Sequence, residues 1–375
     1  MQPAALSIED KKIQKELQAL VEPLLTWYDS GHRILPWREK PDAYRVWISE
    51  IMLQQTRVEA VRPYYDRFLQ AFPNVSRLAD APEEEVLKLW EGLGYYSRAR
   101  NLKKAAMQIR ERYGGVIPDA YEALLQLPGI GSYTAGAIAS IAFGRPVPAV
   151  DGNVLRILAR VRMDAGDITE QRVRRDVQRQ LLAVMPPARA GDFNQALMEL
   201  GAVVCIPNGA PKCAVCPWHG MCRAAAAGET AAYPKKSRAK PRKIEEKTVL
   251  LIQDENRTAL RRRPSRGLLA GMYEFPSLDG HRTEEEVLSY LSAAEYRVLQ
   301  IRRLENARHI FTHKEWHMIG YAIRVDELER PVRHAGMPFL FAEKDETEEK
   351  YPIPAAFAAY AKYLKIRLGN EKYLP

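Results

Sequence analysis

Apolar side chains recur at the three- and four-residue spacing of amphipathic helices through the first 230 residues. The period is clearest over residues 8–30, where it runs from Ile13 to Tyr28. Asp42 stands at the N-cap position of a second helical segment. The same pattern predicts helices at 42–55, 58–72, 83–90, 97–112, 153–162, 169–185 and 192–204. Because strand signals are scarce here, this part of the chain is predicted to be almost all-helical.

Residues 127–158 form the most distinctive stretch of this part. Leu127 to Gly131 is a turn with two glycines, Thr134 to Phe143 is small and apolar, and Asp151 follows just before another helix. Glycines let a backbone approach a partner closely with its N–H groups outward. A helix N-terminus directly behind them makes a phosphate site. The stretch therefore predicts a hairpin that holds a nucleic-acid backbone, with one carboxylate nearby.

The pattern changes to strands near residue 248. Residues 235–247 carry seven basic and two acidic side chains, which predicts an exposed basic linker over 233–247. Beyond it, a hairpin is predicted from 248–252 and 258–261, with further strands at 296–301 and 316–325. Helices are expected at 283–294 and 354–368. The prediction is an all-helical domain at 1–232 and an α+β domain at 248–370.

Length and composition suit a multidomain globular protein of 375 residues, 46% hydrophobic and 27% charged. No apolar run reaches the roughly 18–20 residues that span a bilayer, and the first residues lack a signal-peptide pattern. We therefore expect a monomeric, cytoplasmic, nucleoid-associated protein with no membrane partner. A net charge of +9 favours a polyanionic partner, although solvated surface arginines would give the same excess.

All four cysteines lie in the pattern Cys205-x7-Cys213-x2-Cys216-x5-Cys222. In a cytoplasmic protein, such a cluster indicates metal binding more than disulfides. Four thiolates can hold zinc or an iron–sulfur cluster, and the spacing alone leaves the metal open.

Two carboxylates are candidates for acid–base chemistry. Glu50 lies on a partly apolar helix face, where desolvation would raise its pKa as a general acid requires. An exposed glutamate or a buried salt-bridge partner would fit the same pattern. Asp151 lies in a polar turn and is expected to stay ionised; an N-cap role for the following helix is the structural alternative.

Several segments together resemble MutY-type adenine DNA glycosylases of the endonuclease III, or helix-hairpin-helix, superfamily. These are LPWR (35–38), SEIMLQQTRV (49–58), GLGYYSRARNL (92–102), VDGNV (150–154) and FNQALMELGA (193–202), with the glycine hairpin and the four cysteines. The resemblance implies a helix-hairpin-helix glycosylase domain whose cysteines hold a [4Fe–4S] cluster, then a Nudix-like (MutT-like) domain. Seven residues separate the first two cysteines where the superfamily normally has six.

The resemblance implies base excision repair of double-stranded DNA, with removal of adenine opposite 8-oxoguanine or guanine. The target base must be flipped into a pocket. By resemblance Glu50 protonates adenine, while Asp151 stabilises the oxocarbenium ion, as paired carboxyls do in glycoside hydrolysis. Asn153 is expected to orient Asp151 or the attacking water. Lyase relatives carry a lysine where this chain has Tyr133. A phenol cannot form an imine, so a monofunctional enzyme is predicted, with Tyr133 supporting Asp151 or the transition state.

Recognition residues are also carried over by resemblance. The adenine pocket is assigned to Leu35, Trp37, Arg38, Val58 and Gln195. Contacts to the base stack or lesion are assigned to Gln55, Leu93 and Tyr95, and phosphate contacts to Gly129 and Gly131. Phe311, Thr312 and His313 match a lesion-reading Phe-Ser-His loop, with threonine in place of serine. Because the Nudix hydrolase motif is missing, the second domain is expected to recognise rather than hydrolyse.

Two other functions remain open on the sequence. One is a related glycosylase for another mispair, such as thymine opposite guanine. The other is an iron–sulfur DNA-binding sensor without catalysis, although such a module would not need the pair Glu50 and Asp151.

Overall fold

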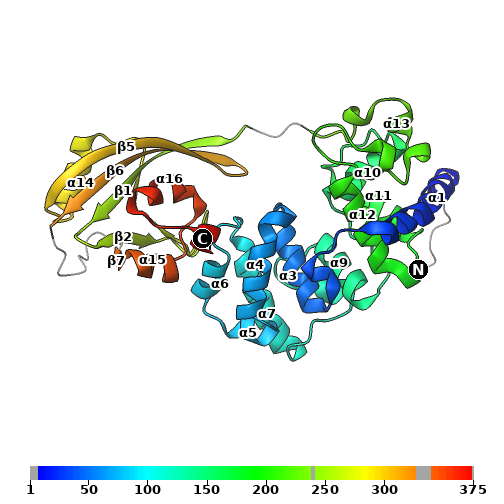
Figure 1. Cartoon of the computed structure of the whole chain (residues 1–375), viewed down its shortest axis with the longest axis horizontal. Helices are drawn as coiled ribbons and strands as arrows, with labels where there is room; N and C mark the ends of the chain where they lie inside the picture. Colours follow the sequence, from blue (N-terminus) through cyan, green and yellow to red (C-terminus); the bar gives the residue numbers. More distant parts are fainter. Residues whose placement is uncertain (1–6, 238–240, 327–338, 374–375) are drawn as a thin grey trace. The chain divides into compact units, whose positions relative to one another are not determined.

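A computed structural model describes residues 7–237, 241–326 and 339–373, and its Cα packing divides the chain into two units. The first unit comprises residues 1–55, 74–76 and 104–238, and the second comprises 56–73, 77–103 and 239–375. The second unit therefore combines a helical segment of the N-terminal half with all of the β-structure described below. Each unit is considered by itself (Figure 1).

The first unit is helical, as the apolar pattern predicts. Its helices are α1 (Ile8–Gly31), α2 (Pro36–Glu39), α3 (Ala43–Leu53), α8 (Tyr121–Leu125), α9 (Ser132–Phe143), α10 (Gly152–Arg162), α11 (Gln171–Leu182), α12 (Ala190–Val203) and α13 (Arg223–Ala226). The predicted N-cap of α3 is confirmed, because the Asp42 carboxylate accepts a hydrogen bond from the amide of Arg45 at 2.9 Å.

The core of the first unit gathers the apolar faces of α1, α10, α11 and α12. Leu24, Val154 and Leu200 are among its fully buried side chains. Trp218, from the cysteine loop, donates its indole N–H to the Leu20 carbonyl at 2.9 Å and so ties that loop to α1. Helix α9 is buried from Thr134 to Ser140 and contacts α3 and α12, which agrees with the expectation that this small, apolar segment crosses a core.

Helices α5 (Val75–Asp80) and α7 (Ser97–Tyr113) cross the boundary between the units. Helices α4 (Val58–Ala71) and α6 (Glu83–Leu89) lie wholly in the second unit. They agree closely with the predicted segments. In the part of the chain that the structure describes, no helix is long and apolar enough to cross a bilayer.

The second unit contains a sheet of order β3-β2-β1-β6-β5, in which β1 and β6 are parallel. Its strands are β1 (Lys243–Gln253), β2 (Arg257–Arg262), β3 (Tyr273–Glu274), β4 (Ser277–Asp279), β5 (Val298–Ile310), β6 (Lys314–Val325) and β7 (Leu340–Glu343). The predicted hairpin is present as antiparallel β1 and β2. Strand β1 begins at Lys243, inside the expected linker, because charged Glu245 pairs with Lys314 of β6 instead of remaining solvated.

Alternating residues of β1 supply two cores, one on each face of the sheet. Val249 and Leu251 pack with Phe357 and Tyr360 near the C-terminus, and Leu250 and Ile252 pack with α14 (Glu284–Ala293). This period of two is the signature of a strand buried on both faces. Figure 1 shows the C-terminal turns in red beside the strands.

The predicted closing helix over 354–368 is wrong as a single helix. Short pieces replace it: 3-10 turns at Ala355–Phe357 and Lys362–Leu364, with α16 (Ala358–Ala361) between them. Helix α15 (Lys344–Lys350) precedes this segment, and a 3-10 turn at Gly369–Tyr373 follows it. Lys365 adopts a left-handed conformation, φ 54°, which ends the helical run.

Candidate active site and cysteine cavity

Glu50 is buried on α3, with 6% of its surface exposed. Its neighbours along the helix, Trp47 and Ile51, are buried as well. Desolvation raises the pKa of this carboxyl to about 7, and the negative charge of Asp151 adds to the rise. The acid-like environment expected from the apolar helix face is therefore present.

The hydroxyl of Tyr133, at the start of α9, donates a hydrogen bond to Oε2 of Glu50 at 2.6 Å. The family resemblance links Tyr133 to Asp151 or the transition state, whereas its hydroxyl bonds to Glu50 and, at 3.5 Å, to the Met198 sulfur. Position 133 is one residue into α9, so its side chain reaches α3, which packs on that helix. This bond stabilises the ionised form of Glu50 and partly offsets desolvation.

Asp151 caps α10. Its Oδ1 accepts from the Val154 amide at 2.8 Å, and its Oδ2 accepts from the Asn153 side chain at 2.8 Å. Desolvation raises the pKa of the carboxyl, and these two donors act against the rise. The N-cap alternative is therefore correct in geometry, and it coexists with electrostatic proximity to Glu50.

Asn153 is held in one orientation by Arg156, a residue that the sequence analysis missed. The Arg156 guanidinium donates to Asn153 Oδ1 at 2.8 Å and to the carbonyls of Gly201 and Cys205 at 2.8 and 3.0 Å. With its oxygen engaged, Asn153 presents its NH₂ group to Asp151. The signal was a cation three residues after Asn153, on the same helix face.

Asn194 fixes the chain that leads to Asp151, and it too was missed. It is fully buried on α12. Its amide accepts from the Ala149 N–H at 3.0 Å and donates to the Val147 carbonyl at 2.9 Å and to Ser140 Oγ at 2.7 Å. Without a side-chain amide here, a buried backbone segment would lose its partners.

The segment LPWR (35–38) begins α2 and contacts Glu199 of α12 through Arg38. Leu35 and Trp37 are buried, whereas Arg38 is partly buried and donates to Glu199 at 2.9 Å. Arg33 clamps the same carboxylate at 2.7 Å, and the two arginines hold the pKa of Glu199 below its usual value against its burial. Glu199 is one helical turn after the half-buried Gln195. The sequence analysis missed Glu199, although its i+4 spacing from Gln195 puts the two on one face.

The glycine hairpin before α9 has the expected shape. Gly129 is exposed with φ 79°, a conformation that favours glycine, and Gly131 is the exposed N-cap of α9. Ile130 between them is buried and anchors the turn. The hairpin thus offers backbone at a helix N-terminus, which is the geometry for a phosphate.

Other predicted DNA-contacting residues differ in exposure. Gln55, in the first unit, is exposed with φ 57°. In the second unit, Tyr95 is 44% exposed with φ 48°, Leu93 is buried and Val58 is half-buried at the start of α4. Left-handed conformations at non-glycine residues cluster at functional sites, which agrees with a role for Gln55 and Tyr95 at the DNA.

The predicted lesion-reading residues form the turn between β5 and β6. Thr312 and His313 are exposed, and Phe311 packs on Trp316 with ring centroids 4.9 Å apart. Thr312 Oγ1 lies within hydrogen-bond distance, 3.3 Å, of the Tyr95 hydroxyl, so the structure brings these two predicted recognition residues together.

Glu274, on β3, is the first acidic residue after Gly271 in the second unit. It is 1% exposed and bound by the guanidinium groups of Arg261 and Arg263. Because two arginines hold this carboxylate, we interpret Glu274 as part of a structural ion-pair network.

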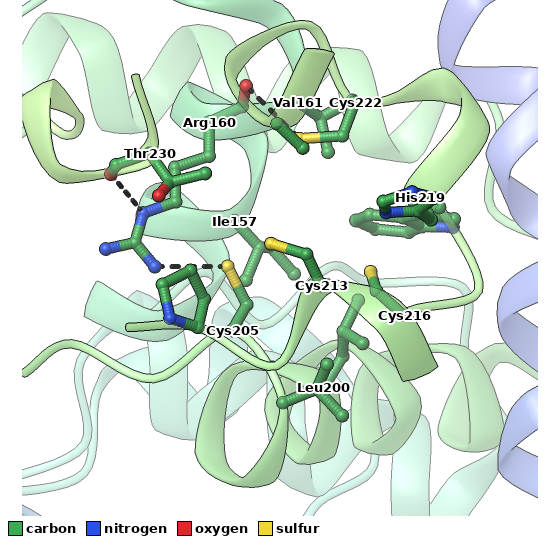
Figure 2. Close-up of a pocket in the computed structure, with 14 residues that line it drawn as sticks. Ile157, Arg160, Val161, Leu200, Cys205, Cys213, Cys216, His219, Cys222 and Thr230 are labelled. Atoms are coloured by element: carbon green, nitrogen blue, oxygen red, sulfur yellow. Dashed lines mark hydrogen bonds between the residues drawn. The ribbon is translucent and has the colours of Figure 1, made fainter. Parts of the chain in front are cut away.

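The four cysteines surround one cavity of the first unit (Figure 2), lined also by Ile157, Arg160, Leu200, Trp218 and His219. Burial raises the pKa of Cys216 to about 11. Arg160 donates to Cys205 Sγ at 3.3 Å and was missed by the sequence analysis. In the described part of the chain, no three carboxylate, imidazole or thiol groups converge closely enough to hold a single ion.

Two family models match this chain. The family model of the HhH-GPD superfamily base excision DNA repair protein matches residues 48–181, and the NUDIX domain model matches residues 248–363. The adenine DNA glycosylase of Rattus norvegicus is 37% identical over 80% of this chain and 69% of that protein. That of Buchnera aphidicola subsp. Acyrthosiphon pisum is 36% identical over 80% of this chain and 85% of that protein.

Among solved structures, a thermostable thymine-DNA glycosylase matches with a TM-score of 0.52 and 29% identity, over 57% of this chain and 98% of that chain. The expected fold class is confirmed: a helix-hairpin-helix domain precedes a Nudix-like domain. These two sequence relatives are adenine DNA glycosylases, and this chain covers most of the length of each. The chain belongs to the adenine DNA glycosylase family of DNA-binding N-glycosylases in base excision repair.

Proposed function

We propose that this protein hydrolyses the N-glycosidic bond of adenine opposite 8-oxoguanine or guanine in duplex DNA. The observation that carries the proposal is the buried Glu50 carboxyl, whose pKa of about 7 leaves much of it protonated at neutral pH. The Tyr133 hydroxyl occupies Oε2, so Oε1 is the oxygen that carries the proton towards the base. A neutral carboxyl of this kind is the general acid that a departing purine needs.

Asp151 supplies the negative charge for the sugar. Of the two carboxyls, Asp151 accepts hydrogen bonds from a backbone N–H and a side-chain NH₂, which favour its ionised form, whereas Glu50 accepts one from a phenol. An ionised carboxylate stabilises the oxocarbenium-like transition state, as in other glycoside hydrolyses. Arg156 orients the Asn153 amide, whose NH₂ group donates a hydrogen bond to Oδ2 of Asp151 and so fixes that oxygen.

The reaction we propose ends at base removal. Position 133 carries a phenol beside the general acid, and a phenol forms no imine with the sugar aldehyde. The product is an abasic site in an unbroken strand. The catalytic groups Glu50, Tyr133, Asp151 and Asn153 all lie in the first unit of a single chain, which supports a monomeric enzyme.

Recognition is divided between the units. In the first unit, Leu35, Trp37, Arg38 and Gln195 are proposed to line the adenine pocket, and the amides of Gly129 and Gly131 to bind phosphate. Gln55, Leu93 and Tyr95 are proposed to contact the base stack. Thr312, which reaches the Tyr95 hydroxyl, supports a lesion-reading role for the Phe311–His313 turn.

We propose that Cys205, Cys213, Cys216 and Cys222 hold a [4Fe–4S] cluster. A cubane takes one thiolate at each of four iron corners, so it suits thiols that surround a cavity without converging on one point. Arg160 would place a positive charge beside the cluster through its contact with Cys205. The purified protein should contain about four irons and four acid-labile sulfides per chain, and stoichiometric zinc without iron would refute the cluster.

The function is tested with duplexes that contain adenine opposite 8-oxoguanine, opposite guanine, or paired with thymine, followed by alkali. We expect abasic sites in the first two duplexes and none in the third. A duplex with thymine opposite guanine tests the second candidate, which the match to a thymine-DNA glycosylase favours. Cleavage of that duplex alone would select it, and inactivity on every duplex with retained binding would indicate a non-catalytic sensor.

A further inference from the structure

Glu91 is a fully buried carboxylate that the proposed chemistry does not use. It follows α6 at the start of the glycine-rich turn, and its side chain is 0% exposed. Its Oε1 accepts from the Ile353 amide at 2.7 Å, and its Oε2 accepts from the Gly369 amide at 3.2 Å and from Lys372 Nζ at 2.7 Å. One side chain near residue 90 thus binds three positions in the last 25 residues of the chain.

Two lysines neutralise this carboxylate, and both are anchored further. Lys88 Nζ contacts Glu91 at 3.3 Å and donates to the carbonyls of Thr347 and Tyr351 at 3.1 and 2.7 Å. Lys372 also donates to the Glu348 carbonyl at 3.1 Å. Both lysine side chains are 10% exposed. A charge network buried to this extent has a fixed geometry, because its charged groups depend on one another for the contacts that water would otherwise supply.

The backbones meet beside this network at Gly92 and Gly369. A Cβ on Gly369 would lie 3.1 Å from Gly92 Cα and 2.8 Å from the Glu91 carbonyl oxygen, so no side chain fits between the two segments. Tyr64 Oη donates to the Glu91 carbonyl at 2.8 Å. Arg67 of α4 bonds Asn370, and its guanidinium stacks on Tyr373 at 4.0 Å. All these groups belong to the second unit, where the C-terminus lies beside α4 and α6 (Figure 1).

Glu91 and Gly92 lead directly into the part of the loop that carries Leu93 and Tyr95. From the first turn of α7, Arg98 donates to the carbonyls of Leu93 and Gly94 at 3.2 and 3.1 Å, and its guanidinium lies 5.5 Å from the Tyr95 ring. Arg98 therefore holds the loop through its carbonyl groups, and Glu91 holds the start of the loop through its bonds to the C-terminal segment. The left-handed φ of 48° at Tyr95 needs such support, because a non-glycine residue holds it only when its surroundings impose it.

We propose that residues 369–373 act as a C-terminal clasp, which positions the loop 92–96 for DNA through Glu91 and Lys372. The inference rests on the proposed function for its DNA substrate. Glu91 and Lys372 are positioning residues: they fix Tyr95 relative to the Thr312 turn before DNA arrives. Pre-organisation of a recognition loop lowers the ordering cost at binding, so the clasp acts on affinity for the lesion duplex rather than on bond cleavage.

Lys372→Met tests the clasp, with Lys362→Met as the matched control. Lys362 pairs with Glu305 at 3.0 Å but is 56% exposed and lies outside the clasp. Lys372→Arg keeps a charge that can reach Glu91. Amide hydrogen exchange of the DNA-free proteins is followed in peptides covering 91–96. Binding of the 8-oxoguanine duplex and the single-turnover excision rate at saturating enzyme are measured separately.

We expect Lys372→Met to speed exchange in 91–96 and to weaken duplex binding about tenfold, with the saturated rate within about twofold of wild type. Lys372→Arg should recover most of both losses, and Lys362→Met should match wild type. Unchanged exchange overturns the clasp. Faster exchange with unchanged binding, or a slower saturated rate with unchanged binding, overturns its role in recognition. A wild-type protein that excises no adenine would refute the proposed function, and the exchange comparison would still decide the clasp.

Discussion

The hydroxyl of Tyr133 lies 2.6 Å from Oε2 of Glu50, so the residue that follows the glycine hairpin contacts the proposed general acid directly. This hydrogen bond lowers the Glu50 pKa, against a larger rise from desolvation. Two buried carboxyls with different partners should give a bell-shaped rate profile whose apparent pKa values belong to the pair. The alkaline limb reports loss of the Glu50 proton near pH 7, and the acid limb reports protonation of Asp151 at its raised pKa.

Tyr133→Phe should move the alkaline limb to higher pH. Loss of one hydrogen bond to the ionised carboxyl corresponds to about half a unit to one unit in the Glu50 pKa. Single-turnover excision measured across pH checks this. The control is Tyr121→Phe, because the Tyr121 hydroxyl accepts a hydrogen bond from Gln178 Nε2 at 3.3 Å. A limb that stays in place or moves to lower pH would contradict the assigned role of the Tyr133 bond.

Glu50→Gln should abolish excision, by about a thousandfold or more, while duplex binding remains. It should also stabilise the protein at alkaline pH. Folding raises the Glu50 pKa from 4.5 to about 7, so the folded state bears a cost above pH 7 that disappears as the pH falls below 4.5. The amide removes that cost, with a gain of up to about 3 kcal/mol at pH 8 and little gain at pH 4.

Denaturant titrations of Glu50→Gln and wild type at both pH values give this comparison. Glu122→Gln, at an exposed position of α8, controls for loss of a carboxylate. An equal gain at pH 4 and pH 8 would sink the proposed ionisation of Glu50, and full excision by the variant would sink its catalytic role.

The local features of the sequence predicted much of this fold. Helix periodicity placed α1, α3 and α10 within a few residues, although only α1 buries a single apolar stripe, whereas α3 and α10 are buried on nearly every side. The apolar run in 248–252 predicted a buried strand, and its residues divide between two cores. The prediction of one helix over 354–368 was wrong because the apolar residues of this segment pack through short turns. Lys365 has a left-handed backbone there, which a pattern of apolar residues does not reveal.

The site shows the same division between local and distant information. Glu50 and Asp151 were identified from their own surroundings in sequence, but the Tyr133 bond joins positions 83 residues apart. Arg156, Asn194 and Glu199 were missed because their roles depend on backbone carbonyls, amides and arginines brought together only by helix packing. Glu91 was missed for the same reason, since its partners in the C-terminal segment begin 262 residues further on.

The phenol at position 133 should also determine where the reaction stops. We expect wild-type protein to leave an abasic site that breaks only after alkali, with no covalent adduct in borohydride. Tyr133→Lys would place an amine in the same site, and we expect it to give a trapped adduct. Tyr133→Phe, which has no amine, should give none. An adduct of the wild-type protein at levels like those of the lysine variant would mean that another amine reaches the sugar.

Gly92 and Gly94 lie in one loop, and both have left-handed φ values, 99° and 72°. Alanine at either position bears a backbone cost of about 1 kcal/mol. Only at Gly92 does the added carbon collide, at 2.3 Å from Tyr64 Oη, whereas nothing lies within 4 Å of a Cβ at Gly94. The Tyr64 hydroxyl cannot move away without breaking its bond to the Glu91 carbonyl. Gly92→Ala should therefore cost about 2–3 kcal/mol more than Gly94→Ala.

Calorimetry of the two variants measures this difference as a further fall of about 5–10 °C in the transition of the second unit. Gly92→Ala should also speed hydrogen exchange around 369–373, because the collision pushes the two backbones apart. Gly94→Ala should leave exchange there unchanged, since no part of the clasp touches that glycine. Equal melting temperatures, or exchange that changes in neither variant, would mean that Gly92 and Gly369 do not pack against each other in solution.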